Sequence, residues 1–199
     1  MKVLVIGAPG TIGKLVVKEL GARHEIVEAS KTRGVHKVDT SSEGSVRQLF
    51  ERIGKVDAIV AVAGNVHFGL LKDMSAEQFK IGLHDKLLGQ VNVALVGQHF
   101  LNDGGSITLT SGILSDEPIL YGANASAVNA AIDGFVRGAA VELERGARIN
   151  AVSPTVLKES WDGYGPYFSG FEAVPGEKVA LAYRRSVEGR QTGQIYRIW

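Results

Sequence analysis

The sequence predicts an α/β fold with a doubly wound, mostly parallel seven-stranded sheet that carries helices on both faces. Seven short apolar, β-branched runs recur along the chain, and helical patterns separate most of them. Such continuous apolar runs are typical of parallel strands buried on both faces. The length of 199 residues fits one domain, residues 1–199. An α+β mixture is the weaker alternative, because the alternation is so regular.

The expected strands are, in chain order, Lys2–Ile6, Glu25–Glu28, His36–Val38, Ala58–Val62, Ser106–Thr110, Arg148–Val152 and Gln194–Ile198. The expected helices show apolar residues at three- and four-residue spacing, and they are Thr11–Leu20, Gly44–Ile53, Ala76–Leu101, Gly122–Leu143 and Glu177–Val187. The longest of them leaves room for an internal break. The least regular stretch, Thr155–Gly176, is rich in aromatic residues, so it is either a substrate-facing lid or a packed connection.

The overall composition excludes several classes of protein. With 22 Lys+Arg against 21 Asp+Glu, the net charge of +1 gives no electrostatic reason to expect nucleic acid or a membrane surface as a partner. The absence of cysteine excludes a disulfide framework and a cysteine nucleophile, and the five histidines show no metal-ligand spacing. The first apolar run, Val3–Ile6, is too short for a signal peptide or a membrane span, which favours a cytoplasmic location.

The first expected strand runs directly into the segment Gly7–Gly13, and an amphipathic helix follows. A dinucleotide site needs a sharp turn here, close approach of the backbone to a pyrophosphate, and a helix N-terminus that faces the anion. Glycine meets the first two needs because it has no Cβ. A purely structural turn is the alternative. The expected cofactor-binding residues of this turn are Gly7, Pro9, Gly10, Thr11, Ile12 and Gly13.

The end of the second expected strand indicates which dinucleotide would bind. An acidic residue there would hydrogen-bond the ribose 2′-hydroxyl of NAD. Glu28 lies inside the expected strand, whereas Ser30, Lys31 and Arg33 lie just beyond it. A hydroxyl with two cations suits a 2′-phosphate, so the sequence favours NADP(H) over NAD(H). Ordinary solvated loop charges are the alternative explanation of the two cations.

Three segments, in order along nearly the whole chain, resemble the short-chain dehydrogenase/reductase family. They are the turn Gly7–Gly13, the segment Val60–Gly64 and the segment Asn150–Pro154. The segments Val38-Asp39 and Gln191-Thr192-Gly193 are similar to smaller signatures of that family. The resemblance implies a Rossmann-type fold and oxidoreductase activity. It also implies further cofactor-binding residues, namely Asp39, Ala63, Gly64, Pro154 and Val156.

The family's catalytic set is incomplete in this chain. The family normally uses an Asn, a Ser, a Tyr that exchanges a proton, and a Lys four residues later that lowers the pKa of the Tyr. When the helix after Gly122 is aligned on its Val-Asn pair, Tyr121 falls on the tyrosine and Ala125 falls on the lysine. Ser111 is the best candidate for the serine, and Ser115 is the second. The resemblance therefore implies Ser111 and Tyr121 as catalytic residues without the usual lysine.

Lys86 falls where the family's active-site asparagine would lie. A nearby positive charge lowers the pKa of an acid, so an ammonium here could favour the Tyr121 phenolate. We hypothesise that Lys86 replaces, from another helix, the cation lost at Ala125. The alternative is a lysine that extends from the helix surface into solvent.

Together these features predict an NADP(H)-dependent oxidoreductase that transfers hydride between nicotinamide and a small carbonyl or alcohol substrate. A protein that binds NADP(H) without turnover, as a sensor or interaction module, is the alternative, and the missing lysine is its main support. A methyltransferase on a similar sheet fits the family-like segments poorly. The helix Gly122–Leu143 is rich in small residues, which favours a homodimer or homotetramer, although close internal packing explains the same pattern.

Overall fold

The seven strands form one sheet in which every pair of neighbours runs parallel. The computed structural model describes residues 1–199. The strands are β1 (Lys2–Ile6), β2 (Glu25–Ser30), β3 (His36–Lys37), β4 (Val56–Ala61), β5 (Leu101–Thr110), β6 (Arg148–Pro154) and β7 (Ile195–Ile198). Their order in the sheet is β3-β2-β1-β4-β5-β6-β7. The predicted seven-stranded, doubly wound architecture is confirmed, and the sheet is wholly rather than mostly parallel.

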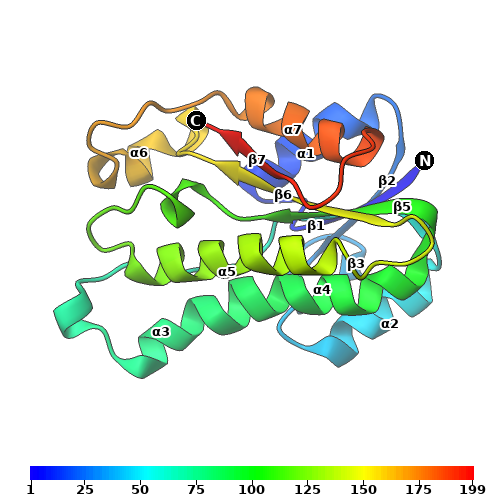
Figure 1. The fold of residues 1–199 in the computed structure, drawn as a ribbon, viewed down its shortest axis with the longest axis horizontal. Helices are drawn as coiled ribbons and strands as arrows, with labels where there is room; N and C mark the ends of the chain where they lie inside the picture. Colours follow the sequence, from blue (N-terminus) through cyan, green and yellow to red (C-terminus); the bar gives the residue numbers. More distant parts are fainter.

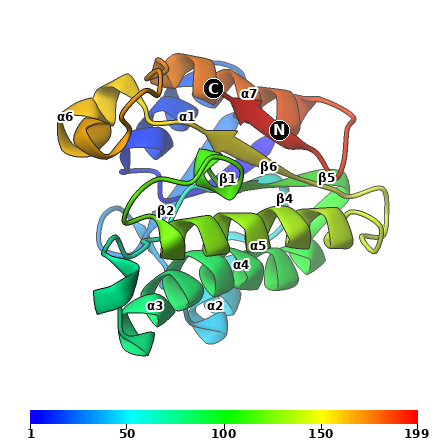
Figure 2. The same ribbon diagram turned by 60° about the vertical axis from the view of Figure 1, so that its left-hand side comes forward.

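Helices cover both faces of this sheet (Figure 1). The α-helices are α1 (Thr11–Gly21), α2 (Glu43–Ile53), α3 (Ala76–Gly82), α4 (Gly89–Gly97), α5 (Ala123–Ala139), α6 (Trp161–Tyr164) and α7 (Gly176–Glu188). Helices α1 and α7 pack together on one face, and α2, α4 and α5 lie on the other, as the rotated view in Figure 2 also shows. None of these helices combines the length and the apolar character needed to cross a lipid bilayer.

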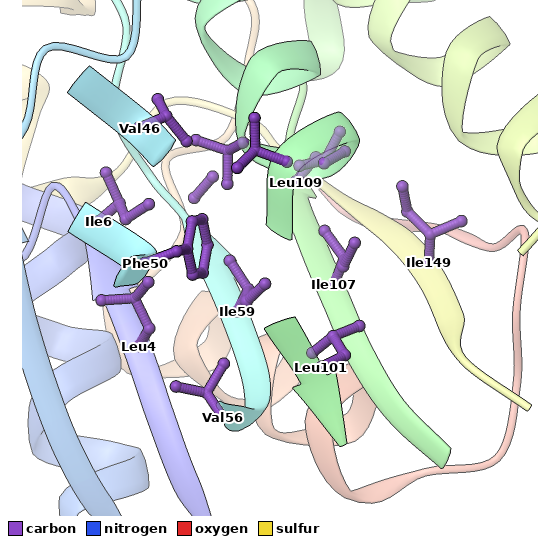
Figure 3. Close-up of a cluster of buried hydrophobic side chains, with 14 of the residues drawn as sticks. Leu4, Ile6, Val46, Phe50, Val56, Ile59, Leu101, Ile107, Leu109 and Ile149 are labelled. Carbon is purple, nitrogen blue, oxygen red and sulfur yellow. The ribbon is translucent and has the colours of Figure 1, made fainter. Parts of the chain in front are cut away.

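The apolar runs of the strands divide their side chains between the two faces. In β1, Val3 and Val5 are buried against the α1/α7 layer, whereas Leu4 and Ile6 are buried against the layer that contains α2. This alternation follows from the two-residue period of a strand, and it explains why the run is apolar throughout. Phe50 of α2 is fully buried among Leu4, Ile6 and their neighbours (Figure 3). Each such side chain stabilises the fold by about 2 kcal/mol through burial.

The long helix expected over Ala76–Leu101 is broken into parts. After α3, residues Leu83–Leu88 form a π-helical turn, and α4 begins at Gly89. Glycine weakens a helix by about 1 kcal/mol relative to alanine, and glycines flank this turn. Wide helical turns of this type occur frequently at functional sites. Lys86 lies within this turn.

Other boundaries also differ from the sequence-based expectation. Strand β5 begins at Leu101 rather than Ser106, so the expected long helix runs into what is in fact a strand. Helix α5 ends at Ala139, four residues before the predicted end. The irregular stretch Thr155–Gly176 contains short helical turns, including α6, and it buries Phe168. It is thus a partly ordered connection that also faces the cavity described below.

Candidate functional site

A mostly apolar cavity with a volume of about 260 Å³ lies at the carboxyl ends of the strands. Its walls come from Ile12 of α1 and from the segments that follow three strands, residues 62–64 after β4, 110–112 at the end of β5 and 154–157 at the end of β6. Helix α6 and the loop before α5 lie at the same end of the molecule, on the left in Figure 1. Ligands of open parallel sheets bind at this edge, so the cavity lies where the topology places a site.

Residues 7–10 form the turn between β1 and α1, and Thr11–Gly13 form the start of α1, so the segment joins strand to helix as the sequence predicts. Gly10 caps α1 without a side-chain hydrogen bond, so the first N–H groups of the helix have no side-chain partner. A Cβ on Gly13 would lie 2.1 Å from the Gly7 carbonyl oxygen, so only glycine allows this approach of helix to turn. The free helix N-terminus and the close backbone fit the pyrophosphate of a dinucleotide.

The residues at the end of β2 are not all placed as expected. Ser30 is the last residue of β2 rather than a residue beyond it, and its hydroxyl accepts a hydrogen bond of 3.0 Å from the Arg33 backbone N–H. Lys31 Nζ lies 2.9 Å from Asp39 Oδ2, and hydrogen bonds from Ser41 and Lys31 hold the pKa of Asp39 below its usual value. Lys31 is therefore already paired, whereas the exposed Arg33 takes part in no ion pair.

The backbone after β4 packs directly on the helical turn that carries Lys86. Gly64 has a φ of +129°, and a Cβ there would lie 2.6 Å from Lys86 Cα. On the other side, Gln90 of α4 makes two hydrogen bonds with the Thr110 backbone. Its Nε2 donates to the Thr110 carbonyl oxygen at 2.9 Å, and its Oε1 accepts from the Thr110 N–H at 2.7 Å. The helix is thereby held against the ends of both β4 and β5, which fixes the position of Lys86 along the cavity.

The ammonium of Lys86 is held inside the molecule. Nζ donates hydrogen bonds to the Ser111 carbonyl oxygen at 3.1 Å and to Asn129 Oδ1 at 2.6 Å, and the residue lines the cavity. Burial lowers the pKa of Lys86 to about 8, and the carboxylate of Asp133 partly opposes this shift. The side chain therefore does not extend from the helix surface into solvent, which was the alternative expectation.

Two buried hydroxyl groups at the cavity have no hydrogen-bond partner in the protein. Ser111 is 3% exposed and Thr155 is 4% exposed, and neither Ser111 Oγ nor Thr155 Oγ1 makes a hydrogen bond of good geometry, although Ser111 Oγ lies near enough to the Asp133 carboxylate to lower the pKa of that group. A buried hydroxyl without a partner is costly, so both groups are suited to contact a ligand. Ser115, the second candidate serine, does not line the cavity, and its hydroxyl donates to the Gly112 carbonyl and Asp116.

The structure brings Lys86 and Ser111 together but leaves Tyr121 apart from them. Tyr121 is not among the residues that line the cavity. Its φ is +69°, an unusual value for a bulky residue, and its ring meets Tyr167 edge-on with ring centres 6.0 Å apart. Ala125, in the place expected for the usual lysine, does line the cavity. The role of Tyr121 as a proton donor stays a prediction.

Comparison with known proteins identifies the family. Residues 14–187 match a family model described as enoyl-(acyl carrier protein) reductase. The chain belongs to the short-chain dehydrogenase/reductase family. It is accordingly an enzyme, an oxidoreductase of a family that binds a nicotinamide cofactor. The predicted family and fold are confirmed.

Three individual proteins illustrate what this short-chain dehydrogenase/reductase is similar to. Versicolorin reductase 1 of Dothistroma septosporum is 29% identical over 180 residues, which cover 78% of this chain and 68% of that protein. The crystal structure of the protein lin1944 from Listeria innocua has a TM-score of 0.99 and 44% identity, over 100% of both chains. A small-chain dehydrogenase in complex with NADPH has a TM-score of 0.88 and 30% identity, over 100% of this chain and 96% of that one.

Sequence reasoning missed several residues of this short-chain dehydrogenase/reductase site. Asn129 holds the Lys86 ammonium, and Asp133, 3% exposed, has a carboxylate oxygen without a hydrogen-bond partner. Together with Ala125, these residues recur every four positions on α5, so helical spacing could have placed them on the face that meets the cavity. Thr155 was expected only as the first residue of the irregular stretch Thr155–Gly176. No sequence signal indicated that its hydroxyl would be buried without a partner.

Proposed function

We propose that this protein is an NADP(H)-dependent reductase or dehydrogenase that transfers hydride between the nicotinamide and a small carbonyl or alcohol. The observation that carries the proposal is one cavity that joins the dinucleotide turn to two unpartnered buried hydroxyls, Ser111 and Thr155, and to the Lys86 ammonium. Each of these groups can donate a hydrogen bond to a carbonyl oxygen or a carboxamide. The cofactor would supply the hydride.

The residues that would hold NADP(H) follow the carboxyl edge of the sheet. The turn Gly7–Gly13 would bind the pyrophosphate, and Asp39 would lie near the adenine. Arg33 would bind the 2′-phosphate, with Ser30 and Lys31 beside it, because Arg33 is the cation without an ionic partner. The residues on the nicotinamide side would be Ala63, Gly64, Pro154 and Val156, which all line the cavity. The similar dehydrogenase in complex with NADPH supports this preference.

Ser111 would polarise the substrate carbonyl through its buried hydroxyl. The hydroxyl makes no hydrogen bond of good geometry, so it can turn from the nearby Asp133 carboxylate toward the oxygen on which negative charge develops. Two residues compete for the role of proton donor. Tyr121 is the donor expected from the family resemblance, with Lys86 as its cationic assistant, but its ring would have to leave Tyr167 and enter the cavity. Lys86 already lines the cavity.

The apolar lining favours a small substrate with an apolar body. Phe68 and Phe168 face the cavity, and Tyr164 lies at 6.0 Å from Phe68 between ring centres. Aromatic walls of this kind favour flat or hydrophobic compounds and fix them with a few polar groups. We infer that the substrate is a small apolar carbonyl compound or the corresponding alcohol.

A direct experiment separates this proposal from binding without turnover. NADPH and NADH binding would be followed by the quenching of protein fluorescence, and NADPH consumption would be followed over a panel of aldehydes, ketones and quinones. We expect tighter binding of NADPH than of NADH, and oxidation of NADPH by at least one carbonyl. Binding of NADPH with no oxidation by any member of a broad panel would favour the sensor alternative.

The assembly state and the cellular location are a smaller part of the proposal. Gly134 and Gly138 of α5 face open space, and Val141 beyond the helix is 85% exposed. A surface with small residues beside an exposed apolar one fits close packing against a second copy, so we infer a homodimer or homotetramer. Light scattering that gives a monomer at high protein concentration would contradict this inference. A cytoplasmic location stays a prediction, and tagged-protein microscopy would test it.

A further inference from the structure

We propose that Lys86 itself, rather than a tyrosine, donates the proton to the carbonyl oxygen during reduction. This inference rests on the proposed function and assigns the proton donor of the same site. It follows from the position of the ammonium, from the hydrogen bonds that it makes, and from the exposed position of Tyr164, the other acid in the cavity lining.

The Lys86 ammonium makes fewer hydrogen bonds than it has N–H groups. A lysine ammonium carries three N–H groups. Two of them are used, toward the Ser111 carbonyl oxygen at 3.1 Å and Asn129 Oδ1 at 2.6 Å, and no partner takes the third. Because Lys86 lines the cavity, the third N–H is the one available to a ligand. The two acceptors therefore orient Nζ and leave one proton for transfer.

The residues around Lys86 Nζ hold the ammonium beside the other polar groups of the cavity. The Ser111 residue whose carbonyl accepts from Nζ also carries the unpartnered Oγ. Lys86 Nζ and Ser111 both line the cavity, so a substrate held there is within reach of the ammonium. Gly64 packs on the backbone of Lys86 and Asn129 holds its end, so the long side chain has little freedom to withdraw.

The cavity lining contains one other acidic side chain besides Lys86. Among the residues that line the cavity, only Lys86 and Tyr164 have side chains with an acidic N–H or O–H that could be transferred as a proton. Tyr164 belongs to the short helix α6, and it is 47% exposed. Tyr121 does not line the cavity, and its ring packs against Tyr167. Lys86 is the acid that is already in place.

The charges around Lys86 set the pH at which it can act. From α5, the carboxylate of Asp133 raises the pKa of Lys86, against the larger lowering by burial that brings it to about 8. Asp85, its neighbour on the same helical turn, directs its carboxylate to the Asn65 backbone N–H at 3.0 Å. Gly64 and the end of β5 contribute backbone and hydroxyl groups without charge. An acid with a pKa near the working pH is suited to general acid catalysis.

The step balances without any further reagent. The carbonyl carbon gains the hydride that reduced nicotinamide supplies, and the carbonyl π bond breaks. The oxygen forms its O–H bond with a proton from Lys86 Nζ, whose N–H bond breaks and leaves a neutral amine. Water returns a proton to that amine after the alcohol leaves. In the direction of oxidation, the neutral amine accepts the hydroxyl proton.

The deciding variant is Lys86→Arg, which keeps the positive charge but cannot release a proton because arginine stays protonated in proteins. If Lys86 donates the proton, Lys86→Arg and Lys86→Gln should both lower the single-turnover rate of NADPH oxidation by about 100-fold or more. NADPH binding should stay within about threefold, because a donor to the substrate carries little of the cofactor's binding energy. Lys80→Arg, on the exposed face of α3, is the matched control, and its rate should match the wild-type rate.

The pH profile provides a second readout. In the wild-type protein the rate of reduction should fall as the pH rises through about 8, because the ammonium form is the donor. Asp133→Asn removes the charge that raises the pKa of Lys86. The fall in rate at alkaline pH, the alkaline limb of the profile, should therefore move to lower pH. Tyr121→Phe should keep the limb at the wild-type pH. Loss of the limb in Tyr121→Phe would overturn the inference and favour the tyrosine.

A third readout does not depend on turnover. In the cofactor-free protein, NMR of lysine labelled with ¹³C at Cε would follow the titration of Lys86, and Lys86→Arg would identify its signal. A midpoint near pH 8 supports the inference, and a midpoint near that of the exposed lysines overturns it. If the Lys86→Arg protein retains the wild-type rate, Lys86 is not the proton donor, whereas the proposed function still stands. A wild-type protein that binds NADPH but reduces nothing overturns the proposed function, and the inference with it.

Discussion

The two ends of the cavity are built on different principles. At the dinucleotide end, the turn Gly7–Gly13 offers backbone N–H groups, and its most constrained contact is between Gly13 and the Gly7 carbonyl. At the chemical end, the polar groups are side chains from separate segments, Lys86 from a π-helical turn, Ser111 from the end of β5 and Asn129 from α5. One end depends on local backbone shape, and the other depends on tertiary packing.

This difference determines how each end responds to substitution. A backbone site tolerates changes of side chain but fails when a Cβ enters the turn. A side-chain site keeps its shape under a conservative change but loses a specific chemical group. Substitutions at the dinucleotide end should therefore act on cofactor binding, whereas substitutions at the chemical end should act on the rate of turnover.

The largest expected effect is at the dinucleotide end. Gly13→Val should weaken NADPH binding by more than about 100-fold, because its Cβ would meet the Gly7 carbonyl oxygen at 2.1 Å and displace α1 from the turn. Fluorescence titration measures the binding, and thermal unfolding shows whether the variant folds. Gly44→Ala, whose Cβ would have its nearest neighbour at 4.0 Å, is the matched control. A folded Gly13→Val protein with near-normal NADPH affinity would contradict this account of the turn.

The next effect is at the chemical end. Ser111→Ala should lower kcat by about 100-fold, the cost of removing one donor to a developing oxyanion, while the dissociation constant of NADPH stays nearly unchanged. Steady-state kinetics and fluorescence titration measure the two quantities. Ser115→Ala is the control, because its hydroxyl bonds to Gly112 and Asp116 outside the cavity. If both variants lose the same activity, Ser111 is not the residue that contacts the carbonyl.

The smallest effect distinguishes the two dinucleotides. Arg33→Ala should weaken NADPH binding by about tenfold, or about 1.4 kcal/mol, and leave NADH binding unchanged, because only NADPH carries the 2′-phosphate. Lys31→Ala should have less effect, since Lys31 Nζ already pairs with Asp39 at 2.9 Å. Titration with both cofactors gives the ratio. An equal loss of NADPH and NADH affinity in Arg33→Ala would show that Arg33 does not bind the 2′-phosphate.

Most of the fold could be predicted from the sequence because its signals are local. The apolar run of β1, the glycine turn and the amphipathic α1 each report their structure within a few residues. The limits of β5 could not be predicted, because the residues before Ser106 are polar and glycine-rich and pair as a strand only through tertiary contacts. The π-helical turn at Leu83–Leu88 was likewise hidden within a continuous helical pattern.

The candidate site was predictable only in part. Ser111 and Lys86 could be proposed from family resemblance, and the structure places them at one cavity. The contact of Lys86 with Asn129 joins residues 43 positions apart, and no local pattern encodes such a pair. The position of Tyr121 depends on its left-handed φ of +69°, which sequence does not reveal for a residue other than glycine.

The most direct test of the central claim is the transfer of deuterium from NADPH labelled at C4 of the nicotinamide. The wild-type protein would be mixed with the labelled cofactor and with carbonyl substrates that give oxidation, and mass spectrometry would analyse the alcohols. We predict that deuterium appears at the former carbonyl carbon, in an amount equal to the NADP⁺ formed. NADPH that binds at the site without passing deuterium to any carbonyl in a broad panel would contradict the account.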